Sequence, residues 1–436
     1  MGTINYDTVI IGGGIAGIQS ALDLADKGMK VLIVEREPSI GGKMIQLSKV
    51  FPTLDCSSCI TTPKMNEVMK HSNIDVWTLA EVSSYQKDSE GIFDVQILQK
   101  ARFVDESCTA CRHCEEVCPV ELPSEFEMGL APRRAIYIPF QTAMPQRAVL
   151  DLDNCIACGK CQAVCPGESI DYAMQDQLSS VKTRSVVLAT GFDLTPLGEK
   201  KEWNADKIPN VISSLAMERI IAPNGPFQGI RRPSDGKIPM SIAFVQCAGS
   251  RDASLGRTYC SRVCCMYAIK QAMLIMGALP VVSVTIYYMD IRAFGKGYEQ
   301  FYETAKAMGV EFVKAKVASI VEDKETQGLR LSIEEISGYG GKREEEHDLV
   351  VLSLGLQSHP NIRSTFTVEI DQTDGFLTSP DLKFNPTLTS QVGVFACGVA
   401  TGPKDIVDSI VEGSAAAMQV MNYLGNKAEV VETVVH

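Results

Sequence analysis

Eight of the fifteen cysteines form two groups with the same spacing, C-x2-C-x2-C-x3-C, each followed by a proline. The groups, called the ferredoxin quartets from here on, are Cys108, Cys111, Cys114 and Cys118, then Cys155, Cys158, Cys161 and Cys165. Three closely spaced thiolates wrap one [4Fe–4S] cube, and the cysteine before the proline ligates the other cube in two-cluster ferredoxins. We therefore expect Cys165 to complete the first cluster and Cys118 to complete the second.

Two other uses of clustered cysteines fit this pattern less well. Zinc usually takes pairs of nearby ligands separated by a longer stretch, which neither quartet offers. Disulfides form in oxidising compartments, and the opening MGTINYDTVI lacks the basic and apolar segments of a secretory signal. We therefore expect a cytoplasmic protein whose clustered thiols are reduced and ligate metal.

Charge and hydropathy limit the partners. A formal net charge of −12 offers no basic stripe for phosphates, which argues against nucleic acid. The longest uncharged run, residues 273–289, is shorter than the roughly 20 residues of a spanning helix and contains Gly277 and Pro280. We interpret it as a helix end, a turn and a buried strand, and expect contact with a membrane only through a partner protein.

A glycine-rich loop near the start of the chain has the spacing of a dinucleotide site. Gly12, Gly14 and Gly17 form G-x-G-x-x-G between an apolar β-rich run and an amphipathic helix. The first glycine allows the tight turn, the second lets a pyrophosphate approach the backbone, and the third lets helix and strand pack. Glu35 ends the next predicted strand, where a carboxylate accepts hydrogen bonds from a ribose. The pattern predicts a βαβ unit with a bound dinucleotide.

Two later segments indicate that this dinucleotide is FAD. LATG (188–191) and VFACG (394–398) resemble the strand-end motifs of the two-dinucleotide-domain flavoproteins that include thioredoxin reductase. The resemblance implies an α/β flavoprotein of that class, interrupted by a two-cluster α+β ferredoxin domain. Val399 replaces the acidic residue usual in that family, whose final strand and helix cover the flavin. Further cofactor-binding residues implied by the resemblance are Gly42, Lys43, Thr190, Gly191, Gly398 and Ile406.

The change of pattern along the chain predicts three kinds of domain. An FAD-binding domain is expected in three parts, residues 1–102, 179–240 (with a linker) and 356–436. The ferredoxin insert is expected at residues 103–178. A second unit resembling a nucleotide-binding domain is expected at residues 241–355.

This second unit lacks the glycine-rich loop that a nicotinamide nucleotide requires. Its first strand ends at Cys247, and three further cysteines follow: Cys260, Cys264 and Cys265. The four predict a third [4Fe–4S] cluster in place of the nucleotide, with Arg251, Arg257 and Arg262 offsetting its charge. Adjacent cysteines are awkward ligands for one cube, however, and the alternative is that some of the four are small buried apolar side chains.

With these residues in view, the chain resembles the flavin-carrying component of the heterodisulfide reductase family, the HdrA-like proteins. The matching stretches are the quartets, PTLDCSSCITTPKM, RRAIYIPFQTAMPQ and CAGSRD…YCSRVCCMYAIKQA. The resemblance implies a [4Fe–4S] cluster on the second-unit cysteines and places Lys270 near the flavin, where a cation stabilises added negative charge. The motif Cys56-x-x-Cys59 is either a redox-active dithiol or a packing feature, and we favour the packing interpretation.

The length of the chain is most similar to short family members of the QmoA type, from the quinone-interacting membrane-bound oxidoreductase. That similarity implies QmoB- and QmoC-like partners at the inner face of the membrane. HdrB- and HdrC-like partners are the alternative. We therefore expect an oxidoreductase component that passes electrons between protein partners in anaerobic sulfur or energy metabolism. Alternatives are an electron-bifurcating HdrA protein, an NAD(P)H-dependent flavoprotein, and a relay whose flavin never turns over.

Overall fold

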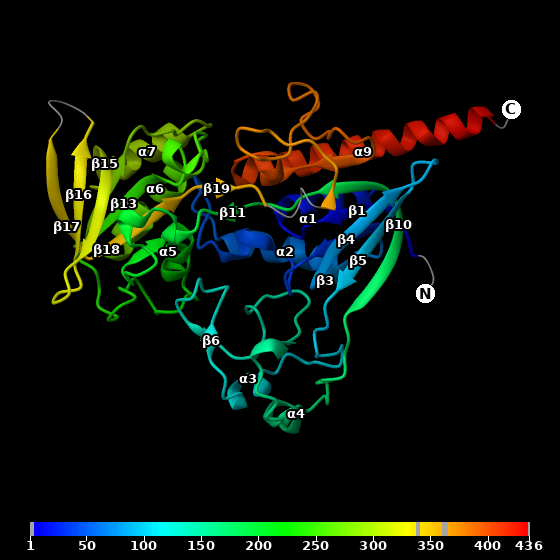
Figure 1. Ribbon diagram of the computed structural model, residues 1–436, viewed down its shortest axis with the longest axis horizontal. Coiled ribbons are helices and arrows are strands. Elements are labelled where there is room, and N and C mark those ends of the chain that lie inside the picture. Colours follow the sequence, from blue (N-terminus) through cyan, green and yellow to red (C-terminus); the bar gives the residue numbers. More distant parts are fainter. Residues whose placement is uncertain (1–3, 337–340, 360–364, 435–436) are drawn as a thin grey trace. The chain divides into compact units, whose positions relative to one another are not determined.

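The computed structural model describes residues 4–336, 341–359 and 365–434, which divide into two compact units (Figure 1). The first unit comprises Met1–Ile45, Ile60–Phe192 and Ser358–His436. The second comprises Gln46–Cys59 and Asp193–Gln357.

The first unit is built on a sheet of seven strands among the described residues. The strands are β1 (Ile4–Ile11), β2 (Val31–Glu35), β3 (Ile74–Thr78), β4 (Ala80–Lys87), β5 (Phe93–Gln99), β10 (Gln177–Leu188) and β20 (Val394–Ala396). Strand β1 pairs in parallel with both β2 and β10, and β2 pairs in parallel with β3. This order is the doubly wound arrangement expected from the sequence.

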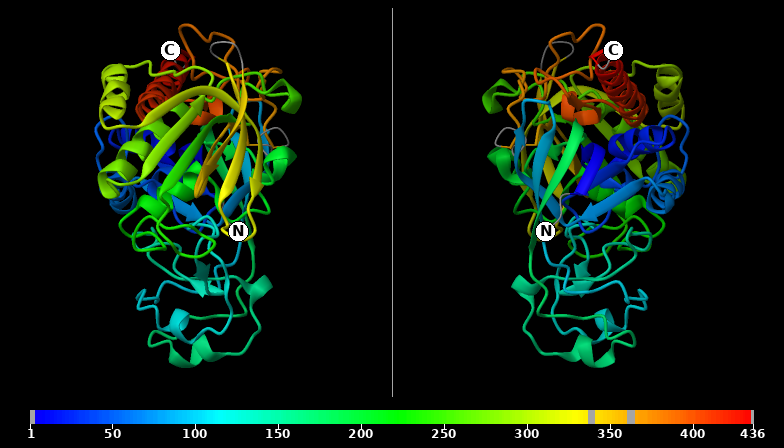
Figure 2. Two further views of the ribbon diagram at one scale, coloured as in Figure 1. Left: turned by 90° about the vertical axis from the view of Figure 1, so that its left-hand side faces the viewer. Right: turned by 90° about the vertical axis from the view of Figure 1, so that its right-hand side faces the viewer.

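Two helices cover one face of this sheet. Helix α1 (Ile15–Ala25) and the C-terminal helix α9 (Ile406–Val434) lie side by side, as the right view of Figure 2 shows in blue and red. Successive side chains of a strand point to opposite faces, so Ile10 joins the core under these helices while Val9 joins the core on the other face. The helices approach closely, since a Cβ on Gly413 would lie 2.6 Å from the carbonyl oxygen of Ala16.

The cysteine-rich segment enters and leaves this sheet at neighbouring strand ends. Gln99 at the end of β5 pairs with Gln177 at the start of antiparallel β10. The chain between them forms short paired strands and the helices α3 (His113–Val117) and α4 (Lys160–Val164), which contact each other. Because its two ends are already adjacent, the insert leaves the sheet and returns to it without interrupting the strand pairing, and its own short strands form separate sheets.

The second unit has its own sheet of seven strands within the described residues, in the order β12-β18-β13-β14-β15-β16-β17. The left view of Figure 2 faces this sheet, drawn in green and yellow. The bounds are β12 (Val211–Ser213), β13 (Ser241–Ala248), β14 (Ser283–Tyr288), β15 (Glu311–Glu322), β16 (Leu329–Glu335), β17 (Lys342–His347) and β18 (Leu349–Leu354). Its helices are α5 (Ser214–Ile221), α6 (Cys264–Ala278) and α7 (Tyr298–Ala307). The first five strands in that order are parallel, and β16 and β17 are antiparallel.

Two features of the fold bear on the sequence-based expectations. Residues 193–240 lie in the second unit, because β12 pairs with β18 there, whereas the sequence assigned them to the FAD-binding part. The uncharged run 273–289 is divided as expected, since α6 ends at Ala278 and β14 begins at Ser283. Among the described helices, none has the length and apolarity needed to cross a membrane.

Candidate functional site

The glycine loop between β1 and α1 contains the three glycines of the G-x-G-x-x-G motif, and only one of these three has open space beside it. A Cβ on Gly12 (φ +108°) would lie 2.3 Å from the carbonyl oxygen of Ala189, and one on Gly17 would lie 2.0 Å from that of Gly12. At Gly14 the nearest protein atom to such a Cβ is the Cα of Gly42, 4.0 Å away. The chain's own packing therefore requires Gly12 and Gly17, while the space at Gly14 suits the close approach of a pyrophosphate.

Glu35 closes this loop from the end of β2. Its Oε2 accepts the backbone N–H of Gly13 at 2.6 Å, and its Oε1 accepts that of Glu37 at 2.9 Å. Burial raises the pKa of the Glu35 carboxyl, although these two backbone N–H groups lower it. Each carboxylate oxygen has a second lone pair, so Glu35 both fixes the loop and retains acceptor capacity for a ribose hydroxyl.

The remaining predicted cofactor residues lie at strand and helix ends of the same unit. Thr190 and Gly191 follow β10, and the buried Thr190 hydroxyl has no hydrogen-bond partner among the residues that the structure describes. Such an orphaned hydroxyl fits a site completed by a bound group. Lys43 follows Gly42 and places its ammonium 5.0 Å from the ring centroid of Phe192.

Gly398 and Ile406 lie at the two ends of a segment that is held by contacts not predicted from the sequence. Ile406 begins α9, and the backbone N–H of Gly398 donates to Oε2 of Glu412 at 3.1 Å. Lys404 is buried and forms an ion pair with the same carboxylate. Glu412, inside α9, thus holds the segment around Val399 although Val399 itself has no acidic group.

Within the ferredoxin insert the structure brings four predicted ligands together. A cavity is lined by Cys108, Cys111 and Cys114 of the first quartet and by Cys165 of the second. This is the exchanged set expected for the first cluster. The rest of the lining is mostly apolar, including Val104, Ile136, Ile138, Ala148 and Ile170. A cavity lined by four cysteines and an otherwise mostly apolar wall suits a [4Fe–4S] cube.

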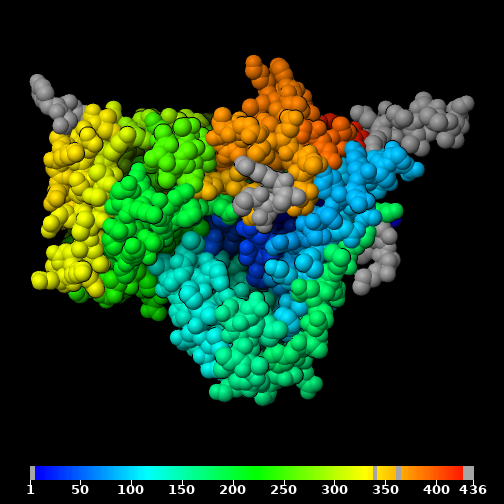
Figure 3. All heavy atoms as spheres, viewed as in Figure 1, coloured from blue at the N-terminus to red at the C-terminus, as the bar shows by residue number. Residues whose placement is uncertain are grey.

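The two quartets have left-handed residues at the same two positions, on either side of the second cysteine. Ala110 and Ala157, the residues before the second cysteine of each quartet, both have left-handed φ angles of 55° and 52°. Arg112 and Gly159, the residues after it, have φ angles of 67° and 72°. In Figure 3 the cyan and green surfaces of the insert, from the two quartets, adjoin each other.

Cys161 of the second quartet has a side-chain partner. The hydroxyl of Tyr172 lies 3.2 Å from its Sγ. Cys161 is buried, whereas Cys111 and Cys158, the second cysteines of the quartets, are exposed. Tyr172 was not predicted, because nothing local marks a tyrosine eleven residues beyond a cysteine as its partner.

The third cysteine set lies in the second unit. Cys247 near the end of β13 has a left-handed conformation (φ 58°), and Cys264 and Cys265 begin α6. The pKa of the Cys265 thiol is raised to about 11, mainly by burial and to a smaller extent by the thiols of Cys247 and Cys260. Burial likewise raises the pKa of the Cys264 thiol, and the other three cysteines add to that shift. All four therefore lie within electrostatic reach of one another.

The three arginines near this set differ in their roles. Arg251 lowers the pKa of Cys247, against the larger effect of burial, and forms an ion pair with Asp290 at 2.6 Å. Arg262 donates its backbone N–H to Cys260 Sγ at 3.3 Å. Arg257 forms an ion pair with Glu199 at 2.6 Å. Within the described ranges, no group of three or more His, Cys, Asp or Glu is arranged around a single metal ion. A [4Fe–4S] cube has different requirements, because each of its four thiolates binds a different iron atom.

Lys270 lies on α6 and is fully buried in an ion pair. Its Nζ donates to Oε1 of Glu218 at 2.6 Å and to the carbonyl oxygen of Lys49 at 2.7 Å. The other oxygen of Glu218 accepts the hydroxyl of Ser48 at 2.7 Å. Glu218 was not predicted, because its partner lies 52 residues further along the chain.

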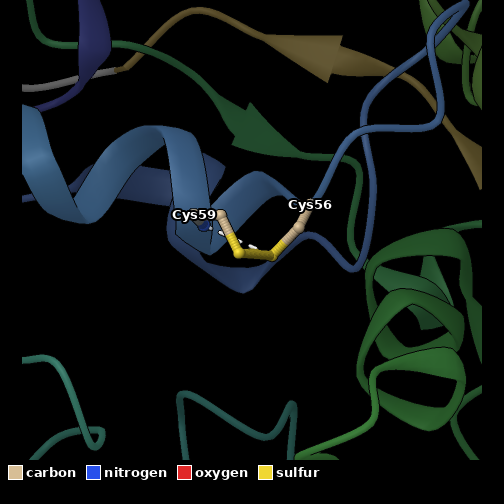
Figure 4. The surroundings of a disulfide bond; sticks show 2 residues. All are labelled: Cys56 and Cys59. Atoms are coloured by element: carbon tan, nitrogen blue, oxygen red, sulfur yellow. Dashed lines mark hydrogen bonds between the residues drawn. A yellow bond between two sulfur atoms is a disulfide. The ribbon is translucent and has the colours of Figure 1, made fainter.

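The structure joins Cys56 to Cys59 in a disulfide at the first turn of α2 (Ser57–Lys70), shown in Figure 4. The sequence led us to expect reduced thiols and favoured a packing role for this pair. Cys59 is exposed and Cys56 partly exposed, so the pair is not enclosed in the core of its unit.

Comparison with known proteins agrees with both parts of this description. Residues 7–58 match the family model of FAD dependent oxidoreductases, and residues 107–170 match that of the 4Fe-4S dicluster domain. Thioredoxin reductase from T. acidophilum superposes with a TM-score of 0.55 at 16% identity, covering 97% of this chain and 99% of that one. Lactococcus lactis thioredoxin reductase gives 0.55 at 15% identity, with the same coverage.

The fold and sites thus define a two-dinucleotide-domain flavoprotein that carries a dicluster ferredoxin insert, as the sequence predicted. Among curated relatives, an iron-sulfur HdrA protein of the CoB–CoM heterodisulfide reductase of Methanopyrus kandleri is 46% identical over 98% of this chain. The HdrA protein of Methanocaldococcus jannaschii is 44% identical over 96% of the chain, and that of the ferredoxin:CoB-CoM enzyme of Methanosarcina mazei 41% over 96%. The chain belongs to the HdrA family of heterodisulfide reductase proteins. It spans 66%, 64% and 53% of the length of these three relatives.

Proposed function

We propose that this chain is an oxidoreductase, the FAD- and [4Fe–4S]-containing electron-transfer component of an HdrA/Qmo-type complex. The observation that supports it best is the cavity lined by Cys108, Cys111, Cys114 and Cys165, in the same unit as the glycine loop. A chain that pairs these two kinds of site links two-electron chemistry at a flavin to one-electron transfer through clusters.

The roles of the residues follow from their surroundings. Gly14 leaves the space for the pyrophosphate, Glu35 accepts the ribose hydroxyl, and the buried Thr190 hydroxyl has bonding capacity to offer a bound group. The start of α9 at Ile406 directs backbone N–H groups and partial positive charge at what lies before it, which favours negative charge there. The quartets each hold one cluster, with Cys165 and Cys118 exchanged.

A third [4Fe–4S] cluster on the second-unit cysteines is part of the proposal. Cys247, Cys260, Cys264 and Cys265 lie close enough to raise one another's thiol pKa, and Arg251 supplies positive charge beside Cys247. The same set stands where a nicotinamide loop would need glycines. This favours a protein partner over NAD(P)H as the electron source, and Lys270 remains our candidate for the cation that acts on the flavin.

The electron partners are proposed to be other redox proteins of the complex, HdrB- and HdrC-like or QmoB- and QmoC-like. The names of the relatives support the first pair, since each describes one subunit of a heterodisulfide reductase. Electron bifurcation at the flavin is the second candidate. It is supported by a relative from Methanothermobacter marburgensis that is named as part of an H(2):CoB-CoM heterodisulfide,ferredoxin reductase.

Anaerobic iron, sulfide and flavin analysis of the purified chain tests this proposal. Three cubes predict about 12 irons per chain, together with one FAD. Iron near eight with an unchanged EPR spectrum in Cys264→Ala would eliminate the third cluster. Rapid bleaching of the flavin by NADH or NADPH in the absence of partners would contradict the choice of electron source. Co-purification with HdrB- and HdrC-like proteins or with quinone-linked membrane proteins decides between the two complexes.

A further inference from the structure

One pair of cysteines is chemically separate from the proposed cluster ligands. Of the fifteen cysteines, the structure leaves thirteen free and joins Cys56 to Cys59. Twelve of the free thiols form the three ligand sets, and the thirteenth, Cys397, is fully buried. The Cys56–Cys59 disulfide therefore has no role in the function proposed above.

The position of this disulfide is unlike that of a structural crosslink. It closes over only two intervening residues, Ser57 and Ser58, so it removes little chain entropy compared with a bond across a long loop. Cys59 is exposed to solvent, and Cys56 is partly exposed. Exposed disulfides are the labile class that takes part in exchange or catalysis.

The surroundings make the two sulfurs chemically different. Cys56 immediately precedes α2, and its Sγ accepts the backbone N–H of Cys59 at 3.3 Å. A sulfur in this position at a helix start is stabilised as a thiolate by that hydrogen bond and by the helix dipole. A stabilised thiolate is the better leaving group in disulfide exchange, so Cys56 leaves when the more exposed Cys59 is attacked.

The first turn of α2 also lacks one regular helical hydrogen bond. Pro63 lies inside α2 and has no N–H, so the carbonyl of Cys59, four residues earlier, lacks its usual helical partner. The turn that carries Cys59 therefore lacks one backbone hydrogen bond that would otherwise resist small movements when the sulfur–sulfur bond opens.

We propose that Cys56 and Cys59 form a redox-active dithiol–disulfide pair that exchanges with external dithiols. In the reducing direction, one thiolate of the dithiol attacks Sγ of Cys59, the Cys56–Cys59 bond breaks, and Cys56 leaves as a thiolate held by the Cys59 N–H. The second thiolate of the external dithiol then attacks the dithiol's first sulfur, which is bound to Cys59 in the mixed disulfide. This step expels the Cys59 thiolate, which takes up a proton. The external dithiol is oxidised by two electrons to its disulfide, and the protein pair is reduced by the same two.

Thiol mapping on the purified, cofactor-loaded chain tests this under native conditions. The tryptic peptide of residues 50–64 contains both cysteines and no others, so its mass after alkylation reports the state of the pair without interference from cluster ligands. Dithiothreitol should convert the peptide to its doubly alkylated form in the folded protein, and glutathione disulfide should restore the crosslink. A pair that reacts only after denaturation, or that does not re-form, would overturn the proposal.

Two single variants separate the roles of the sulfurs. Cys56→Ser should trap one glutathione per chain on Cys59 as a stable mixed disulfide, and Cys59→Ser should alkylate at Cys56 with a pH midpoint well below the roughly 8.5 of an ordinary thiol. Ser58→Ala, between the two, should behave as the unaltered chain. No adduct on Cys59 together with an ordinary pH profile for Cys56 would show an inert pair. Flavin and iron contents should be unchanged in all three variants, so failure here is distinct from failure of the proposed function.

Discussion

The hydroxyl of Tyr172 lies 3.2 Å from Sγ of Cys161, the third cysteine of the second ferredoxin quartet. The equivalent cysteine of the first quartet, Cys114, interacts instead with the backbone of Glu115. Two quartets with identical spacing therefore present different donors to the sulfurs of their third cysteines. An O–H donor stabilises the added negative charge of a reduced cluster, so the two clusters are expected to differ in potential.

Replacing Tyr172 with phenylalanine should lower the potential of the second cluster. The substitution removes one hydrogen bond, worth about 1 kcal/mol, while the ring is retained. For a one-electron couple that corresponds to about 40 mV. An EPR-monitored redox titration of Tyr172→Phe measures it, with the first cluster as the internal reference. Equal shifts in both clusters, or none, would show that the hydroxyl does not act on Cys161.

The exchange of the fourth ligand predicts which variants resemble one another. Cys165→Ala should damage the same cluster as Cys111→Ala, because both residues line the cavity of the ferredoxin insert. Cys158→Ala should damage the other cluster. Each substitution at most removes one cube, or about four irons per chain. Comparing the EPR spectra of the three variants decides the matter, since an uncrossed arrangement would instead make Cys165→Ala resemble Cys158→Ala.

Gly14 and Gly17, in the glycine loop between β1 and α1, should respond differently to an added methyl group. A Cβ at Gly17 would lie 2.0 Å from a backbone oxygen, so Gly17→Ala should destabilise the first unit and lose FAD. At Gly14 a Cβ meets no protein atom closer than 4.0 Å, so Gly14→Ala should fold normally and yet bind FAD at least roughly tenfold more weakly. Flavin release and circular dichroism distinguish the two effects. Full FAD retention by Gly14→Ala would mean that the pyrophosphate lies elsewhere.

Features encoded by short spacing were predictable from the sequence, because a local pattern already fixes their geometry. The quartets and the glycine loop are of this kind, and the family comparisons confirm a dicluster domain and an FAD-binding domain at those positions. The exchange of Cys165 between the two clusters stays a prediction, which rests on the repeated spacing and on the place of Cys165 in the cavity lining.

Partners that meet through the tertiary fold were not predictable. Glu218 reaches Lys270 from another helix, and Glu412 holds Gly398 from within α9. Neither position carries a local signal, since a lone glutamate on a helix is usually solvated. The placement of residues 193–240 was missed for the same reason, because a strand as short as β12 shows its partner, β18, only once the sheet is formed.

The ion pair between Lys270 and Glu218 allows structural and redox roles of Lys270 to be separated. Both side chains are at most 2% exposed, so Lys270→Met leaves a buried unpaired carboxylate and should cost about 3–5 kcal/mol of stability. The double variant Lys270→Met/Glu218→Gln removes that charge and should recover much of the loss. Thermal unfolding measures this part.

The flavin midpoint potential in the same double variant tests the redox role. If Lys270 acts on the flavin, the potential should fall even where stability is restored, because a positive charge that stabilises added electrons has been removed. An unchanged potential in the stable double variant would confine Lys270 to the ion pair.

His347 should make the stability of the second unit depend on pH. Its Nδ1 lies 2.7 Å from the hydroxyl of Ser241 and its Nε2 lies 2.8 Å from that of Tyr287, and burial lowers its pKa to about 4. The unfolded chain, with a pKa near 6.5, binds the proton first as the pH falls. The stability that comes from the neutral ring is therefore complete above about pH 6.5 and is lost progressively down to about pH 4. Between pH 7 and pH 5 the loss should be about 2 kcal/mol.

The comparison that isolates this effect is between the unaltered chain and His347→Gln, which retains a polar side chain but has no proton to titrate. Thermal unfolding of both at about pH 7 and pH 5 gives a difference of differences from which acid effects on the clusters and other groups cancel. The unaltered chain should lose more stability than the variant over this interval. Equal losses would mean that His347 is accessible to protons in the folded unit and that its hydrogen bonds to Ser241 and Tyr287 do not hold it neutral.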